Sequence, residues 1–169
     1  AYGSLVVVPE FGIVLNNEMD DFSIREGYPN LYGAIGNAAN AIAPKKRMLS
    51  SMTPTIVLKD GLPYIIAGSP GGTTITTTVF QTLMNMLEFR LSPEDAVNKP
   101  KFHHQWLPDI IYTEKNFPET VSGQLKNMGY TVTGREPIGR TELIVVNRLQ
   151  RKKIIAIADY RGDDDARGF

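Results

Sequence analysis

Three short segments of this chain contain residue types that could bind and polarise a small charged substrate. Glu18, Asp20 and Asp21 fall within four residues and supply carboxylates, which can hold an ammonium group or a metal ion. Ser50 and Ser51 are adjacent and supply hydroxyl groups and main-chain amides, which can hold a carboxylate. A cation site and an anion site together suit a zwitterionic substrate that resembles an amino acid.

The third segment is a glycine pair, Gly71 and Gly72, between a predicted strand and a predicted helix. Glycines let the backbone approach a ligand closely, and amides at a helix N-terminus lie at the positive end of its dipole. Such a turn can form an oxyanion hole from the main chain alone. The structural alternative is a tight turn that needs glycine only for its positive φ.

The other two segments also have structural alternatives. The carboxylates could be solvated turn residues or a helix cap, and the serines could form an ordinary loop edge. A metal site is not expected, because His103 and His104 lie far along the chain, in an aromatic segment where we expect them to pack and hydrogen-bond. The chain has no cysteine, which excludes thiol catalysis within it. Several threonines fall in the predicted helix after Gly72, but none has an evident base.

Hydrophobic periodicity predicts the elements that must position these residues. The predicted strands cover 5–8, 13–15, 53–58, 64–67, 110–114, 130–133, 143–147 and 154–158. The predicted helices cover 73–89, the stretch between a Ser92 cap and Pro100, and 118–128. Asp60-Gly61 indicates a hairpin, 150–153 indicates a turn, and 23–48 indicates a long functional or mobile loop. The strands on either side of Asp60-Gly61 are almost continuously apolar, which predicts that both of their faces are covered.

Composition limits the class of protein further. The 169 residues fit one domain, 1–169, with a mixed α+β pattern. Lys plus Arg and Asp plus Glu both number 18, so the net charge is zero, which argues against nucleic-acid binding or a polybasic membrane surface. No apolar run is long enough to span a bilayer. We expect neither a metal nor another cofactor.

Taken in order, six segments resemble the small subunit of the gamma-glutamyltransferase family, also called gamma-glutamyl transpeptidase or glutathione hydrolase. They are LNNEMDDF (15–22), PNLYG (29–33), LSSMTPT (49–55), GSPGG (68–72), FHHQWLP (102–108) and the tail ADYR (158–161) with GF (168–169). Each motif is modest alone, but the six occur in order over nearly the whole chain.

The resemblance implies part of an N-terminal-nucleophile hydrolase fold, a four-layer αββα sandwich. It implies a precursor that cleaves itself into a large and a small subunit, in the periplasm or outside the cell. The small subunit then starts with a threonine, which is the nucleophile and whose α-amine is the base. The expected activity is cleavage of the γ-glutamyl amide of glutathione and related compounds, with transfer to water or to an amino acid or peptide acceptor.

The resemblance also assigns residues of this chain to the substrate. It assigns Glu18 and Asp21 to the α-ammonium group, Ser50 and Ser51 to the α-carboxylate, Tyr32 to a lid over the glutamyl group, and Gly71 and Gly72 to the oxyanion hole. An arginine of the large subunit is expected to help the two serines.

The chain departs from the family pattern at its start, which is Ala1-Tyr2-Gly3-Ser4 rather than the nucleophilic threonine. We therefore expect this chain to be inactive alone. Loss of an N-terminal strand and of the large subunit would expose apolar sheet surface, so we also expect self-association or marginal stability. Two alternatives stay open. One is an inactive fold retained as a binding or structural module, and the other is a related amidase that acts on poly-γ-glutamate or acyl amides.

Overall fold

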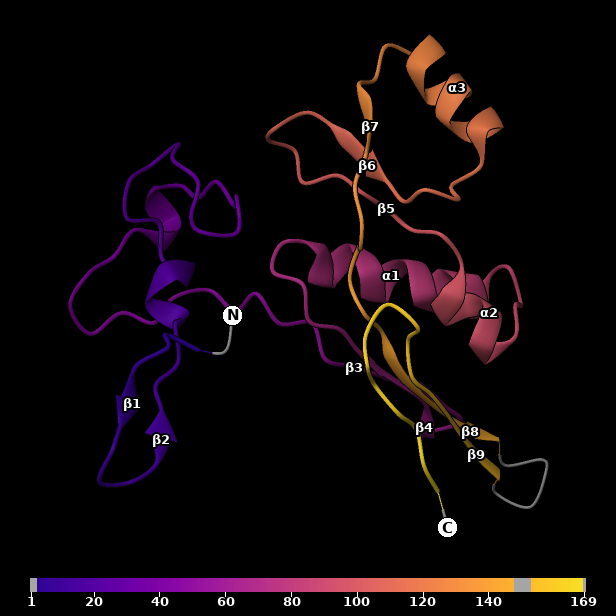
Figure 1. Ribbon diagram of the computed structural model, residues 1–169, viewed down its shortest axis with the longest axis horizontal. Helices are drawn as coiled ribbons and strands as arrows, with labels where there is room; N and C mark the ends of the chain where they lie inside the picture. The colour runs from indigo at the N-terminus through magenta and orange to yellow at the C-terminus, as the bar shows by residue number, and fades with distance from the viewer. Residues whose placement is uncertain (1–2, 148–152, 169) are drawn as a thin grey trace. The chain divides into compact units, whose positions relative to one another are not determined.

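The computed structural model describes residues 3–147 and 153–168, and its contacts divide the chain into two compact units, Ala1–Ser51 and Met52–Phe169 (Figure 1). Helices and strands are mixed along the chain, as the α+β prediction requires. That the two units form a single domain stays a prediction.

The first unit consists mainly of loops around a small hairpin. β1 (Val7–Val8) pairs antiparallel with β2 (Ile13–Val14), and two short 3-10 turns follow, η1 (Glu18–Asp21) and η2 (Ala38–Asn40). Between 23 and 48 the described backbone has no α-helix and no strand longer than a single bridge, which confirms the predicted long loop.

A four-stranded antiparallel sheet forms the centre of the second unit. β3 (Thr55–Lys59), β4 (Leu62–Gly68), β8 (Glu142–Asn147) and β9 (Lys153–Ile157) follow one another in that spatial order. The predicted hairpin joins β3 to β4, and both of its turn residues have positive φ, 54° at Asp60 and 75° at Gly61. Two positive φ values define the turn that Asp-Gly favours in a two-residue hairpin.

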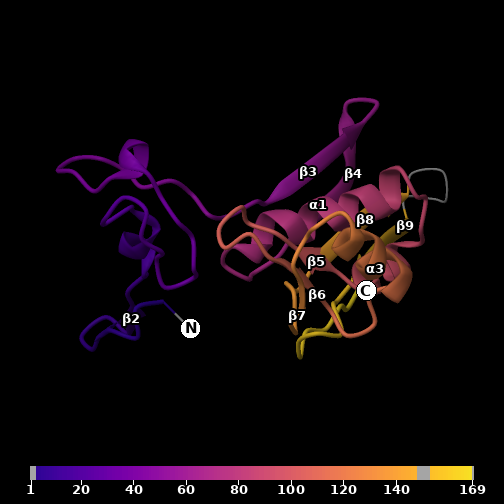
Figure 2. The ribbon, with the colours of Figure 1, turned by 90° about the horizontal axis from the view of Figure 1, so that it is seen from above.

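Two helices cover one face of this sheet. α1 (Thr74–Leu87) lies along it and α2 (Pro93–Asn98) packs beside α1 (Figures 1 and 2). Ser92 caps α2 as predicted, because its Oγ accepts from the Asp95 amide at 3.1 Å. The buried core between helices and sheet consists of Ile65, Ala67, Val79, Val97, Leu143 and Val145.

The opposite face of the sheet is apolar but exposed. Ile56 and Leu58 on β3 are 62% and 59% exposed, and Ile144 on β8 is 40% exposed. The register places Ile56 beside Ile66, and Ile66 beside Ile144, so these side chains form a row across three strands. The prediction that both faces of these strands are covered is therefore wrong for this chain by itself, because its helices cover only the α1 side.

A second, smaller sheet completes this unit. β5 (Phe102–His103) pairs antiparallel with β6 (Ile111–Thr113), which pairs parallel with β7 (Val132–Gly134). α3 (Glu119–Asn127) connects β6 to β7 and is followed by Gly129 at φ 96°, as predicted for a helix end. β5 was not predicted, because its two residues are too few to show a period. Residues 150–152 of the predicted turn lie outside the described part.

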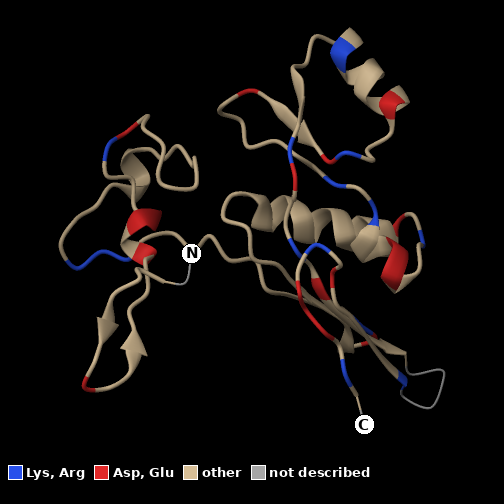
Figure 3. Ribbon diagram, viewed as in Figure 1, with Lys and Arg blue, Asp and Glu red and all other residues tan. Residues whose placement is uncertain are grey.

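Both units contain acidic as well as basic residues (Figure 3). Within the described ranges, no helix has the length and apolarity needed to cross a membrane.

Candidate functional site

The acidic segment forms η1, directly after the β1–β2 hairpin. Asn16 lies two residues before its start, and its Oδ1 accepts the Glu18 amide at 3.0 Å. Phe22 follows and is only 6% exposed, so it anchors the end of the turn. Glu18 is exposed, whereas Asp21 is half-buried. The turn therefore presents Asp21, and not Glu18, to the interior of this unit.

Asp21 and Ser51, thirty residues apart, come together in the structure. Ser51 Oγ donates to Asp21 Oδ2 at 3.2 Å. Asn40, on η2, holds the two segments in place: its Nδ2 donates to the Asp21 carbonyl at 2.7 Å and its Oδ1 accepts the Leu49 amide at 3.0 Å. The cation binder and the anion binder predicted from the sequence are thus neighbours.

This contact lies in a pocket of about 340 Å³ within the first unit. Asp20, Asp21 and Ser51 line it, together with Asn40 and Arg25. Among the described residues, Glu18, Ser50 and Tyr32 are not part of its lining. The pocket therefore collects part of the predicted set, and Arg25 adds a cation that the sequence analysis did not single out.

Tyr32 lies at the tip of the long loop and contacts the start of η1. Its hydroxyl accepts from Asn17 Nδ2 at 2.8 Å. Asn30 shapes the loop, since its Oδ1 accepts the amides of Tyr32 and Ala34. The Asp20 carboxylate accepts the Leu31 amide at 3.0 Å, so Asp20 fastens this loop to η1.

Sequence reasoning missed the two asparagines that organise the pocket, Asn30 and Asn40. The available signal was their place in a loop rich in Gly and Pro, where asparagine side chains bond nearby backbone groups. That signal indicates a turn but does not tell which distant amide the side chain reaches.

The glycine pair forms a strand-to-helix turn in the second unit. Gly71 has φ 139° and Gly72 has φ 58°, and α1 begins two residues later. Their carbonyls accept hydrogen bonds from the first turn: Gly71 O accepts Thr74 N at 3.1 Å and Gly72 O accepts Ile75 N at 3.2 Å. The amides of both glycines stand at the positive end of α1. A Cβ on Gly71 would lie 2.3 Å from Thr74 Oγ1, so glycine is required there.

A threonine on α1 does have a histidine partner. Thr77 Oγ1 lies 2.8 Å from His103 Nδ1, and His103 Nε2 lies 2.9 Å from Gln105 Oε1. His103 is 1% exposed, and burial lowers its pKa. This confirms that His103 packs and hydrogen-bonds, because a substrate cannot reach a buried ring.

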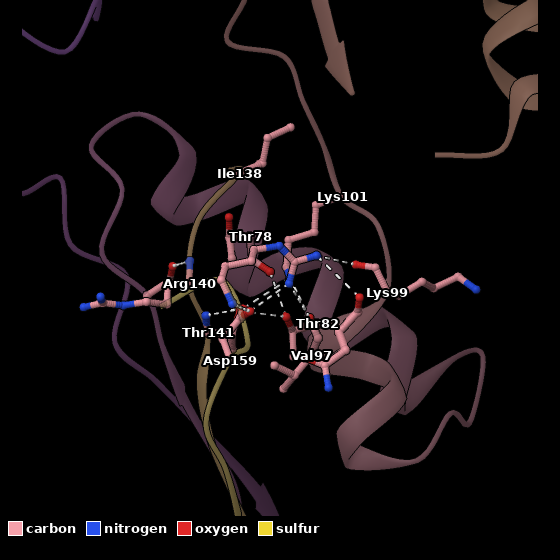
Figure 4. A network of polar contacts seen from close by, with 12 residues as sticks. Thr78, Thr82, Val97, Lys99, Lys101, Ile138, Arg140, Thr141 and Asp159 are labelled. Atoms are coloured by element: carbon pink, nitrogen blue, oxygen red, sulfur yellow. Dashed lines mark hydrogen bonds and ion pairs between the residues drawn. The ribbon is translucent and has the colours of Figure 1, made fainter. Parts of the chain in front are cut away.

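A buried ionic cluster lies at the end of α2 (Figure 4). Arg161 donates to Glu114 through Nε at 2.6 Å and Nη2 at 2.7 Å, and to Asp159 at 2.9 Å. Lys101 Nζ donates to the Val97 carbonyl at 2.6 Å and lies 3.6 Å from Asp159. The cluster therefore joins α2, β6 and the C-terminal segment.

The cluster shifts the pKa values of its members. Burial, followed by the charge of Arg161, lowers the pKa of Lys101 to about 8. Burial raises the pKa of Glu114, but hydrogen bonds from Arg161 and from the Ile138 and Lys101 amides outweigh it, so the net pKa lies below 4.5. Both carboxylates of the cluster stay ionised, since Asp159 is also lowered.

The structure thus brings Asp21 and Ser51 together in the first unit and forms the Gly71–Gly72 turn in the second. Within the described residues, no group of three or more His, Asp or Glu side chains is placed to hold a metal ion.

Comparison with solved structures defines the class of fold. A mutant of Helicobacter pylori gamma-glutamyltranspeptidase matches with a TM-score of 0.90 and 43% identity, over 96% of this chain and 88% of that one. A cephalosporin acylase from Bacillus halodurans matches with a TM-score of 0.80 and 25% identity, over 95% of this chain and 28% of that one. The chain has the fold of N-terminal-nucleophile hydrolases, as predicted.

Comparison of sequences identifies the family within this fold class. The profile of the gamma-glutamyltranspeptidase family matches residues 1–169, and the chain belongs to this family of enzymes. The glutathione hydrolase proenzyme of Escherichia coli is 45% identical over 164 residues, which are 97% of this chain and 28% of that protein. The proenzyme of Pseudomonas aeruginosa is 49% identical over 134 residues, 78% of this chain and 24% of that protein. The chain spans about a quarter of the length of these curated relatives.

Proposed function

We propose that this chain is the small-subunit part of an enzyme that cleaves the γ-glutamyl amide bond of glutathione and related compounds. The observation that supports this most directly is the contact between Asp21 and Ser51 inside a pocket. A γ-glutamyl group has its α-ammonium and α-carboxylate on one carbon. Groups that bind them must therefore be close neighbours, as these two side chains are.

In this proposal each predicted residue has one role. Asp21, with Glu18, binds the α-ammonium group, and Ser51, with Ser50, binds the α-carboxylate. Tyr32 lies on a lid that covers the glutamyl group. Neither Glu18 nor Ser50 lines this pocket, so we place them at its rim.

The reaction would proceed through a covalent intermediate. A threonine hydroxyl, from a segment N-terminal to Ala1 in the precursor, attacks the γ-carbonyl carbon while its own α-amine takes the proton. The amides of Gly71 and Gly72 stabilise the tetrahedral oxyanion. The C–N bond then breaks, the leaving amine takes the proton, and water or an acceptor amine releases the glutamyl ester.

The same proposal names a partner and a location. The chain covers 28% of the Escherichia coli relative, which leaves ample length for a large subunit. A large subunit would cover the exposed sheet face of β3, β4 and β8 and supply an arginine to the α-carboxylate. By resemblance we place the mature protein in the periplasm or outside the cell.

The test is release of the chromophore from γ-glutamyl-4-nitroanilide. We expect the full-length precursor to cleave itself and to release nitroaniline, and the isolated 169-residue chain to release none. A precursor that cleaves itself but leaves the anilide intact would act on a different amide. One that neither cleaves itself nor reacts would show that this is a retained, inactive module.

A further inference from the structure

The loop 138–141 lies directly against the glycine turn. A Cβ built on Gly71 would lie 3.5 Å from Gly139 Cα. Gly139 itself has φ 66°, and a Cβ there would meet the Thr78 side chain at 2.1 to 2.7 Å. The loop therefore packs closely on α1 and on the turn before it.

The Ser69 hydroxyl links this loop to the turn. It accepts the Arg140 amide at 2.9 Å and donates to the Pro70 carbonyl at 2.7 Å. That carbonyl belongs to the peptide bond between Pro70 and Gly71. Because a peptide is planar, fixing its C=O also fixes the direction of its N–H, which is the amide of Gly71.

Without such a link the peptide could rotate as a unit. Glycine adopts φ on either side of zero with little cost, so Gly71 offers little resistance to a peptide flip. A flip would turn the carbonyl to where the N–H had pointed and would replace a hydrogen-bond donor with an acceptor. The Ser69 hydroxyl opposes this by holding the carbonyl at one position.

The loop that holds Ser69 is itself fixed by buried carboxylates (Figure 4). The Ile138 amide donates to Glu114 at 3.0 Å, and the Thr141 amide donates to Asp159 at 2.8 Å. Ile138 and Thr141 are both fully buried. The Arg140 guanidinium forms an ion pair with Asp164 at 2.8 Å. A continuous path therefore runs from the buried cluster through the loop to the Ser69 hydroxyl.

We propose that Ser69 is a positioning residue, whose hydroxyl locks the Pro70–Gly71 peptide with the Gly71 amide in the orientation that an oxyanion hole needs. The inference rests on the proposed function, because it assumes that this amide stabilises the oxyanion. It adds a residue that touches no substrate and acts only through the orientation of a peptide group.

The test compares Ser69→Ala with the wild type in the full-length, self-cleaved enzyme, with rates normalised to the amount of processed small subunit. We expect kcat for the γ-glutamyl anilide to fall about tenfold, less than the 10²–10³-fold that follows from losing a donor outright. KM should change by less than about twofold, because the glutamyl α-carbon groups bind elsewhere.

Two inhibitors distinguish a loss of amide positioning from general damage to the substrate site. A boronic acid built on the glutamyl skeleton forms a charged tetrahedral adduct with a nucleophilic hydroxyl, so its Ki should rise in Ser69→Ala by the same factor as kcat falls. The Ki of free glutamate, which forms no such adduct, should not change.

Ser69→Thr keeps the hydroxyl and should recover kcat to within about threefold of the wild type. Ser122→Ala, on α3, is the matched control and should match the wild type.

The outcomes are distinct. An active wild type with an unchanged kcat in Ser69→Ala overturns the positioning role and leaves the proposed function intact. A raised KM with unchanged kcat, or a Ser69→Thr variant as slow as Ser69→Ala, also overturns it. A self-cleaved wild type that releases no nitroaniline refutes the proposed function itself.

Discussion

Asp21 is held through both its side chain and its main chain. Its carboxylate oxygen accepts from Ser51, and its main-chain carbonyl accepts from Asn40. The side chain is half-buried, so a charge placed there is only partly screened by water. A half-buried carboxylate attracts an ammonium group strongly. Its hydrogen bond also fixes the orientation of the Ser51 hydroxyl.

The first prediction is that Asp21→Asn in the self-cleaved enzyme raises KM for the γ-glutamyl anilide at least about 30-fold. A desolvated ammonium that loses a charge-assisted partner loses about 2 to 5 kcal/mol, and each 1.4 kcal/mol is a factor of ten. Steady-state kinetics measures it, and Glu10→Gln in the exposed β1–β2 turn serves as the control. An unchanged KM in Asp21→Asn would remove Asp21 from the substrate site.

Asn40 offers a second variant for the same prediction, since it touches the backbone of both segments. Asn40→Ala should raise KM less than Asp21→Asn, because it removes two uncharged hydrogen bonds rather than a charge. Asn40→Asp keeps the acceptor for Leu49 but places a carboxylate oxygen against the Asp21 carbonyl, which Asn40 Nδ2 contacts at 2.7 Å, so it should raise KM at least as much as the alanine variant. A normal KM in both Asn40 variants would show that the loop holds Asp21 without this side chain.

At the scale of elements, features that depend on neighbouring residues were predicted from the sequence, whereas features that depend on distant contacts were not. The Asp60-Gly61 hairpin and the Ser92 cap depend on residues within a few positions of each other, and both formed as expected. β5 is too short to show a period, and the ionic cluster depends on contacts across the chain: Arg161 reaches Glu114, which is 47 residues away. No pattern in a single sequence indicates which distant carboxylate a given arginine will meet.

The same distinction applies to the candidate site. The acidic, serine and glycine segments could each be assigned a binding chemistry from the sequence, because that chemistry depends on residue types within one short segment. It did not predict that Asp21 would lie in the pocket while Glu18 stays exposed, which follows from the 3-10 turn and from Phe22. The roles of Asn30 and Asn40 required knowledge of the folded loop.

The ionic cluster holds three elements together, and its loss should be costly. Arg161, Glu114 and Asp159 have side chains that are 3%, 6% and 0% exposed. Removing one member leaves an opposite charge buried without its partner, which costs about 3 to 5 kcal/mol. We therefore expect Glu114→Gln to lower the free energy of unfolding of the self-cleaved protein by about that amount, measured by urea denaturation at pH 7. Glu119→Gln, exposed on α3, is the matched control and should lie within about 0.5 kcal/mol of the wild type.

The pH dependence of stability checks the same cluster. Glu114 and Asp159 have lower pKa values folded than unfolded, so the unfolded state binds protons first as the pH falls. Their contribution is present above their ordinary values of 4.5 and 3.8 and is lost progressively below them, through the folded pKa values. Glu114→Gln should therefore lose less stability than the wild type between about pH 5 and pH 3. Parallel acid limbs for the two proteins would contradict a role for this carboxylate.

For the whole molecule, the uncovered sheet face is the feature that most distinguishes this chain from a self-sufficient domain. α1 and α2 bury one face, while Ile56, Leu58, Ile144 and Ile154 stay exposed on the strands, the last at 66%. A contiguous apolar surface on a sheet is stable in water only when another layer covers it. The fold class supplies that expectation, because an αββα sandwich has a second sheet at this position.

The last prediction concerns what this face does when no partner is present. The isolated 169-residue chain should self-associate at micromolar concentration, and Ile144→Lys should shift it toward the monomer, because a charge on this apolar face must be desolvated on contact. Size-exclusion chromatography with light scattering measures the mass. Met128→Lys is the matched control, since Met128 is 72% exposed but lies outside this face, and it should associate like the wild type. In the full-length precursor, Ile144→Lys should reduce recovery of the two-subunit enzyme if the same face binds the large subunit, as we propose. A wild-type chain that stays monomeric, together with normal assembly of the Ile144→Lys precursor, would show that this face needs no cover.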